Sequence, residues 1–447
     1  MPASPWAASG RKCTSSRFPS SGKLPGRTRA PIPIPGRGPV SRFLLGSPSM
    51  SEVPSVGVGL VGAGFLAQTR ARGYRQVGQV DLNLVAICSK SEARAQDFAK
   101  QHRIGSVYQD FQAFLKHPGL DAVDLCVPNH LHKEMAVAAA QAGKHVLCTK
   151  PMTAYVGQDL PSTADDAAVS AVAPAQMADI AIAEGEAMVD AAQQAGVFLA
   201  YGENWLHAPA MKRAWQLFQS SGGAVLEMRG WECHNGSHSP YAKIWRYTGG
   251  GALLRLGAHP VGSMLHWKAM EGRNRTGVPI APVAVTAEVA DLSLNPALNS
   301  ENCRVAQGWV DVENWGCVVI QFEDGSRGVA YGSDNHLGGM ESRLEISASN
   351  CHFKVNLSPN DMLRAYASNE QVFEGEYLME KVDSRAGWST PMPNEDWTSG
   401  QFGLCQDFAE AVAYRRPPLA EGDLGVATTR VLYAAYQAAA EGRRVTL

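Results

Sequence analysis

Apolar runs alternate with helix-length segments between Ser55 and Gly202, and this pattern constrains the fold more than any other feature of the sequence. The apolar runs are VGVGLVG at Val56, LNLVAIC at Leu82, AVDLCV at Ala122, HVLCTK at His145 and VFLAYG at Val197. Strands that are apolar on both faces are typical of parallel sheets covered by helices on both sides. The sequence therefore predicts an α/β fold with a doubly wound parallel sheet in this part of the chain.

A different pattern follows Gly202. A helical stretch comes first, then longer strands in which apolar and polar residues alternate, and finally helical stretches around Phe408 and Val426. Within FEDGSRG, the Asp-Gly pair between alternating runs predicts a tight hairpin. Because 447 residues exceed what one hydrophobic core usually serves, we expect two domains: residues 51–203 with the parallel sheet, and residues 204–447 with an α+β fold.

Two segments depart from these patterns. Residues 1–50 are rich in Pro, Ser, Gly and Arg, and the first 49 contain no Asp or Glu, so we expect a disordered N-terminal extension. Its Arg-rich start resembles an organelle transit peptide without an amphipathic helix, whereas Met50 resembles a natural beginning. An insertion over about 155–180 is rich in Ala, Asp, Ser and Pro, and we interpret it as a solvated loop or as a lid over the site.

Composition excludes several classes of protein. The net charge of −2 does not indicate a basic surface that would bind nucleic acid or an anionic membrane. No apolar run approaches the roughly 20 residues that span a bilayer. The nine cysteines are odd in number and scattered, which favours reduced thiols and a cytoplasmic protein over a secreted disulfide scaffold. We therefore expect a small-molecule partner, no nucleic acid and no membrane.

The first apolar run ends in GLVGAGFLA, which contains a G-x-G-x-x-A motif. Gly62 permits a tight turn, Gly64 lets the backbone approach a pyrophosphate, and Ala67 lets the helix pack close to the sheet. Phe65 and Leu66 open that helix, whose first N–H groups favour a phosphate. Since the motif follows a buried strand and begins a helix, it predicts a dinucleotide-binding Rossmann domain; the alternative is a plain tight turn.

The end of the second apolar run bears on which dinucleotide is bound. NAD-binding folds usually present an Asp or Glu to the ribose hydroxyls here, but this chain has Ser89, Lys90 and Ser91. A hydroxyl and an ammonium suit a 2′-phosphate. We therefore expect NADP in preference to NAD, and the other interpretation is that these residues only cap the next helix.

The segment CVPNHLHKEMAVAAAQAGKHVLCTKPM resembles the Gfo/Idh/MocA oxidoreductases, the family of glucose-fructose oxidoreductase and inositol 2-dehydrogenase. The family pattern is a Pro-Asn with a following His, then Gly-Lys-His-Val and Glu-Lys-Pro, and the resemblance extends from Val56 to the C-terminus. It implies a C-terminal domain on an open mixed sheet, with one face over the active site and the other often in a subunit interface. We accordingly expect a homo-oligomer, a dimer or a tetramer.

The resemblance also implies roles for single residues around the cofactor. Those residues are Pro128, Asn129, His132, Thr149, Lys150, Trp245 and Arg246. The first three would line the nicotinamide side of the pocket, and Lys150 would stand between cofactor and substrate. Thr149 occupies the position of the family's glutamate, so a carboxylate near that lysine is missing.

The segment TGGGALLRLGAHPV belongs to the same resemblance, in which the family has an Asp and, four residues later, a His. His259 occupies the histidine position and Arg255 the aspartate position. In a continuous helix the two would share a face, although Pro260 disfavours a helical conformation at His259. We expect both to face the substrate, where the cation would lower the pKa of His259 and Lys150; alternatively, Arg255 pairs with an acid elsewhere.

Oxidation of a carbinol by a nicotinamide needs a base for the hydroxyl proton, and the candidates are Lys150 and His259. The alternatives are a phosphate or ribose contact for Lys150 and a core position for His259. His234 and His238 lie in a turn-rich segment that we expect at the substrate end. Together with Glu232 these histidines could suggest a metal, but without a second cluster we expect none.

Three classes of function remain open. The first is an NAD(P)-dependent dehydrogenase or reductase acting on a sugar, polyol or cyclitol. The second is a glycosidase or epimerase that retains and cycles its cofactor, and the third is a dinucleotide-sensing protein without catalysis. Because a sensor needs neither Lys150 nor His259, we expect an enzyme of the first class.

Overall fold

A computed structural model describes residues 53–447, apart from 238, 299–301, 359–362, 379–383 and 392–393. The N-terminal extension expected over residues 1–50 and the substrate-site candidate His238 lie outside the described residues.

The first sheet has six parallel strands in the order β3-β2-β1-β4-β5-β6. They are β1 (Ser55–Val61), β2 (Asp81–Cys88), β3 (Ser106–Tyr108), β4 (Ala122–Leu125), β5 (His145–Thr149) and β6 (Leu199–Gly202). This is the strand order of the dinucleotide-binding Rossmann fold, and it confirms the predicted doubly wound sheet. The order reverses between β1 and β4, so a crevice is expected at the carboxyl ends of these strands.

Helices connect the strands and cover the sheet, as the apolar strands require. They are α1 (Phe65–Tyr74), α2 (Glu92–His102), α3 (Phe111–Leu115), α4 (His132–Gln141), α5 (Asp166–Ser170) and α6 (Pro174–Ala195). The interpretation of residues 155–180 as a loop is partly wrong, because α6 already begins at Pro174 and α5 lies within the segment. Apart from Met177 and Met188, the buried residues of α6 are small, such as Ala181 and Gly185, and they give a weak apolar stripe.

The second sheet has seven strands in the order β12-β11-β7-β10-β9-β8-β15. Its strands are β7 (Val225–Cys233), β8 (Pro282–Ala290), β9 (Trp315–Phe322), β10 (Arg327–Ser333), β11 (Glu341–Ala348), β12 (His352–Asn356) and β15 (Val445–Thr446). Strands β7 and β10 pair in parallel and the other neighbours pair antiparallel, so the sheet is mixed. The predicted hairpin is confirmed as the β9–β10 turn, where Gly325 has φ +84°. A small third sheet joins β13 (Ala365–Ala367) and β14 (Gly387–Ser389).

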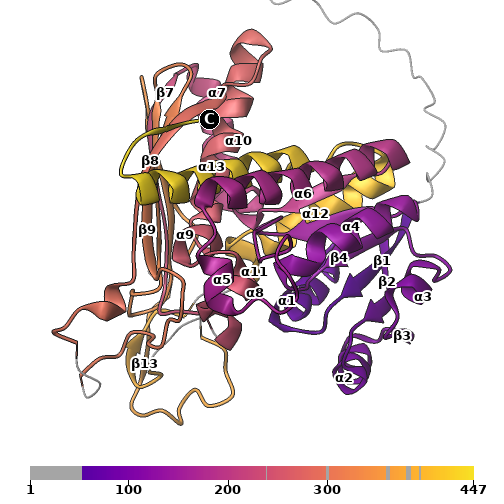
Figure 1. Cartoon of the computed structure of the whole chain (residues 1–447). Coiled ribbons are helices and arrows are strands. Elements are labelled where there is room, and N and C mark those ends of the chain that lie inside the picture. Colours follow the sequence, from indigo (N-terminus) through magenta and orange to yellow (C-terminus); the bar gives the residue numbers. More distant parts are fainter. Residues whose placement is uncertain (1–52, 238, 299–301, 359–362, 379–383, 392–393) are drawn as a thin grey trace, which may run out of the picture. The chain divides into compact units, whose positions relative to one another are not determined.

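The second half also contributes α7 (Pro209–Ser221), α8 (Trp245–Thr248), α9 (Ala252–Arg255), α10 (Ala258–Thr276), α11 (Glu395–Thr398), α12 (Gln401–Tyr414) and α13 (Gly422–Glu441). Helices α9, α10 and α13 pack on one face of the mixed sheet, and α13 also lies along α6 (Figure 1). Helix α12 packs on α1 of the first sheet. Because the last helices contact both sheets, the domain boundary expected near residue 203 stays a prediction.

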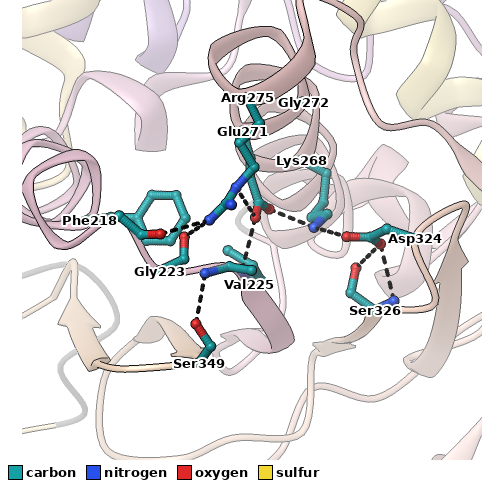
Figure 2. Close-up of polar contacts among 12 residues, drawn as sticks. Phe218, Gly223, Val225, Lys268, Glu271, Gly272, Arg275, Asp324, Ser326 and Ser349 are labelled. Atoms are coloured by element: carbon teal, nitrogen blue, oxygen red, sulfur yellow. Dashed lines mark hydrogen bonds and ion pairs between the residues drawn. The ribbon is translucent and has the colours of Figure 1, made fainter.

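A buried ion cluster fixes α10 to the strands of the mixed sheet (Figure 2). The Nζ of Lys268, which is 0% exposed, donates to Glu271 at 2.6 Å and to Asp324 at 2.8 Å. Glu271 also accepts the backbone N–H of Val225 at the start of β7. The cation is therefore held by two carboxylates from different elements, as a buried charge requires.

The described cysteines are free thiols. Among the residues that the structure describes, no helix combines the length and apolarity needed to cross a membrane.

Candidate active site

The glycine loop after β1 has the geometry that a bound pyrophosphate requires. Gly62 has φ +99°, and a Cβ there would lie 2.3 Å from the carbonyl oxygen of Cys126, so only glycine fits. Gly64 is the N-cap of α1, and a Cβ on it would meet no atom within 4 Å. Ala67 is fully buried, as close packing of helix and sheet requires, whereas Phe65 is 63% exposed. The open space at Gly64 adjoins the first N–H groups of α1 and fits a dinucleotide pyrophosphate.

The residues after β2 divide between capping and the expected cofactor pocket. The Ser91 hydroxyl oxygen accepts a hydrogen bond from the backbone N–H of Arg94 and caps α2, as the second interpretation required. Lys90 is exposed. Burial lowers the pKa of the His130 imidazole, and the charge of Lys90 lowers it further, which puts Lys90 near the segment after β4. Ser89 and Lys90 remain candidates for contact with a 2′-phosphate.

The candidates after β4 hold neighbouring segments together. The Asn129 side-chain amide donates to the carbonyl of Thr248 at 2.6 Å, which ties this segment to α8. The ring nitrogens of His132 lie 3.0 Å from the carbonyl of Met152 and 2.9 Å from that of Val127, and burial lowers the pKa of the ring. His132 therefore links the segments that follow β4 and β5, while its contact with a nicotinamide stays a prediction.

Lys150 follows β5 and reaches α9. Its Nζ donates to the carbonyl oxygen of Arg255 at 2.7 Å, although the two residues are far apart in the sequence. Thr149, the last residue of β5, is buried beside it. The backbone of the expected substrate segment thus positions Lys150 at the carboxyl edge of the parallel sheet.

His259 lies in the first turn of α10, where the missing N–H of Pro260 costs no helical hydrogen bond. Helix α9 ends at Arg255 and α10 begins at Ala258, so the two candidates lie on separate helices, not on one shared face. The His259 ring stacks on Trp205 with 5.5 Å between ring centroids. Burial and the charge of Lys150 hold the pKa of His259 well below its ordinary value.

Sequence reasoning missed Glu203, which directly follows β6. Its side chain is 0% exposed, and its Oε1 and Oε2 lie 2.8 and 3.1 Å from Nδ1 of His259. Burial raises the pKa of Glu203 to about 8, while the backbone N–H of Trp205 and the charges of Lys150 and Arg70 act in the opposite direction. The available sequence signal was a carboxylate at the end of an apolar parallel strand, the edge where ligands bind in such sheets.

The structure gives Arg255 a carboxylate partner. Its Nη2 donates to Asp334, which is 0% exposed, and its guanidinium lies 5.9 Å from the centre of the Trp309 ring. Nδ1 of His234 lies 3.7 Å from the other oxygen of Asp334. This pairing is the alternative that the sequence left open, and the cation that lowers the pKa of His259 is Lys150. Contact of Arg255 or His234 with substrate stays a prediction.

Trp245 and Arg246 hold the insertion that precedes α6. The Arg246 Nε donates to Asp166 at 2.7 Å and its Nη2 donates to the carbonyl of Ala164. The Trp245 indole N–H donates to the carbonyl of Tyr155 at 3.1 Å. The guanidinium of Arg246 is thus engaged by the insertion, and a cofactor contact of either residue stays a prediction.

A family model described as an oxidoreductase family with an NAD-binding Rossmann fold, GFO_IDH_MocA, matches residues 56–171. Levoglucosan dehydrogenase of Pseudarthrobacter phenanthrenivorans is 24% identical over 339 residues, which cover 71% of this chain and 77% of the relative. D-xylose 1-dehydrogenase (NADP(+)) 2 of Haloferax volcanii is 24% identical over 365 residues, covering 81% of this chain and 91% of the relative.

Solved structures agree with these matches. The structure of GenD2 from gentamicin A biosynthesis in complex with NAD has a TM-score of 0.71 and 25% identity, covering 88% of this chain and 97% of that one. Levoglucosan dehydrogenase in complex with NADH and L-sorbose has a TM-score of 0.65 at 21% identity, with 88% and 99% covered, and it supports the fold.

Proposed function

This chain belongs to the Gfo/Idh/MocA oxidoreductase family, and on that premise we propose that it is an NAD(P)-dependent dehydrogenase or reductase of a sugar, polyol or cyclitol. The observation that carries the proposal is the convergence of Lys150 and His259 at the carboxyl edge of the parallel sheet. The glycine loop after β1 opens on the same edge, because the carboxyl ends of parallel strands lie together.

The residues of this edge divide the work of the reaction. When bound, the oxidised nicotinamide supplies the acceptor for the hydride that leaves the carbinol carbon. Lys150 and His259 are the groups that take the hydroxyl proton, and burial lowers the pKa of His259, which favours a neutral ring. The glycine loop and the first turn of α1 hold the pyrophosphate.

NADP is proposed as the preferred cofactor. Support comes from Ser89 and Lys90 at the end of β2, where an ammonium complements a 2′-phosphate. Some relatives are named as NADP(+) enzymes, among them the xylose dehydrogenase and a scyllo-inositol 2-dehydrogenase of Bacillus subtilis.

A homo-oligomer through the mixed sheet and a cytoplasmic location complete the proposal. A Cβ on Gly230 would meet Met264 of α10, so the next residue, Trp231, points to the opposite face of the sheet. There Trp231 stacks on Tyr331 with 5.9 Å between ring centroids, which supports a contact surface. Light scattering would measure the molar mass in solution and so test the oligomer. The free cysteines support a cytoplasmic location.

The test is a screen of sugars, polyols and cyclitols with added NADP+ or NAD+, read by formation of the reduced nicotinamide. Lys150→Met should lower kcat by about 100-fold or more, in the range of a lost acid–base group, with dinucleotide affinity within a few fold. The matched control is Lys144→Met at the other end of β5, where Nζ donates to the carbonyl of Leu120.

An active Lys150→Met variant would refute the assignment of Lys150 as a group that takes the hydroxyl proton. A variant that binds no dinucleotide would show instead that Lys150 contacts the cofactor. Turnover by the purified protein without added cofactor would point instead to an enzyme that retains and cycles its NAD(P).

A further inference from the structure

We propose that Glu203 is a positioning residue for the base His259 and that the two side chains exchange protons with the substrate as one unit. The proposal rests on the function proposed above. The family pattern has an acid four residues before this histidine, where this chain has Arg255. We assign the role of that acid to Glu203, the residue after β6.

Contacts from three directions fix this pair. Both Glu203 oxygens lie within hydrogen-bonding distance of Nδ1 of His259, at 2.8 and 3.1 Å. Oε1 also accepts the backbone N–H of Trp205 at 3.1 Å, which anchors the carboxylate. The Trp205 indole stacks on the imidazole with only 8° between the ring planes. The ring can therefore turn neither about its own axis nor away from the carboxylate without losing these contacts.

Charged groups around the pair favour a carboxylate at this position. The charges of Lys150 and Arg70 lower the pKa of Glu203. The charge of Glu203 in turn adds to the burial that raises the pKa of the Tyr201 phenol. Arg70 is buried against Asp124 at 3.4 Å, so its charge is already matched. Lys150 acts on both members of the pair, which makes the lysine, the glutamate and the histidine one electrostatic group.

The geometry fixes which ring nitrogen reacts. With Nδ1–H donating to Glu203, the lone pair of the neutral ring lies on Nε2. In the oxidation, the substrate O–H bond breaks and an Nε2–H bond forms, while the C–H electron pair leaves as hydride to NAD(P)+ and the carbonyl forms. The imidazolium so produced is stabilised by the adjacent carboxylate, as in a hydrogen-bonded acid–base pair of a hydrolase. In reduction the same proton returns from Nε2.

The pair should titrate as one unit. Burial raises the pKa of Glu203 to about 8 and lowers that of His259, so we expect the pair to share one proton and to release it near pH 8. Below this pH Nε2 carries a proton in both possible arrangements. Either a neutral Glu203 donates to Nδ1 of a neutral ring, or an ionised Glu203 lies beside a doubly protonated ring. Above it Nε2 is a base. The kcat/KM for oxidation should therefore rise as the pH increases through 8, which gives the pH profile a rising limb there. Reduction should be favoured below this pH.

The test compares Glu203→Gln, Glu203→Asp and the parent enzyme in kcat/KM against pH. An amide cannot titrate and carries no charge, so in Glu203→Gln the limb should move from near pH 8 to below 6.5. We expect kcat to fall by about 100-fold or more with KM within a few fold. Glu203→Asp should keep the limb and recover part of kcat, because it keeps the charge.

Glu271→Gln is the matched control. It removes an equally buried carboxylate from the same helix as His259, about 18 Å along its axis at 1.5 Å per residue, and should leave the limb in place. A limb near pH 8 that survives in Glu203→Gln overturns the proposal, and so does an unchanged kcat.

A second measurement separates this proposal from the proposed function. Long-range proton–nitrogen NMR spectra report the tautomer and titration of His259 without turnover, with the signal assigned from His259→Asn. In the parent protein the ring should carry its proton on Nδ1 above pH 8, and Glu203→Gln should shift its titration downward. If the parent reduces neither dinucleotide with any substrate, the dehydrogenase proposal fails while this titration still decides on Glu203. An unchanged titration overturns the pairing, and Glu203→Asp gives the answer if Glu203→Gln does not fold.

Discussion

Replacing Gly64 by alanine should weaken dinucleotide binding without harming the fold. Gly64 has φ −92° and ψ −168°, a conformation that alanine adopts, and its Cβ would enter open space. The free energy of unfolding should therefore stay the same or rise by about 0.4–1 kcal/mol, because alanine restricts the unfolded chain. The new methyl group occupies the space beside the first N–H groups of α1, where the pyrophosphate would lie.

The expected loss of affinity follows from those N–H groups. A hydrogen bond to a charged group contributes about 1.5–3 kcal/mol, so displacing one raises Kd roughly 10- to 150-fold. Fluorescence titration with NADPH and NADH measures this change, and urea unfolding measures stability.

Gly62→Ala is the contrasting variant. Its positive φ and the carbonyl oxygen at 2.3 Å from a Cβ should cost about 1–2 kcal/mol of stability or more. A Gly64→Ala protein that binds both dinucleotides within twofold of the parent would show that the glycine loop does not hold the pyrophosphate.

Further variants test other parts of the structure. Lys90→Ala should raise Kd for NADP roughly 10- to 150-fold and leave NAD nearly unchanged, by loss of a charge-assisted hydrogen bond; equal losses, or tighter NAD binding by the parent, would contradict the NADP preference. Lys268→Met should lower the free energy of unfolding, measured by urea titration, by about 3 kcal/mol, since two carboxylates lose their buried cation. Loss of the exposed Arg229 ion pair should leave the urea midpoint nearly unchanged. Arg255→Met should lower the free energy of unfolding by about 3 kcal/mol, because the buried Asp334 loses its guanidinium partner. In that variant the pH limb of kcat/KM should not move, because Lys150 is the cation acting on His259; an upward shift would place the guanidinium beside the base.

Local patterns in the sequence were enough to predict the parallel sheet, the glycine loop and the β9–β10 hairpin. Each depends on neighbouring residues: apolar runs, Gly62 with Gly64, and an Asp-Gly pair. The start of α6 was missed because Met177 is the only buried residue among its first seven, so no apolar stripe marks where the helix begins.

The polar partners at the site could not be read in the same way. Glu203 and His259 are in contact although they lie 56 positions apart in the sequence, and Asp334 and Arg255 lie 79 positions apart. Such pairs are set by how β6, α9, α10 and β10 pack, and a single sequence holds no record of that register. The sequence therefore indicated which residue types the site would contain, but the partner of each came from the tertiary structure.

The return of the last helices to the first sheet makes the two halves of the described chain depend on each other. The backbone N–H of Tyr201 in β6 bonds to the carbonyl of Ala420, and Arg70 of α1 donates to Gln401 of α12. The Sγ of Cys405 lies where a Cβ on Gly73 would be only 2.7 Å away, so α1 and α12 are in close contact. A chain growing from the ribosome therefore cannot make all the contacts of its parallel-sheet half until α12 and Ala420 have been synthesised.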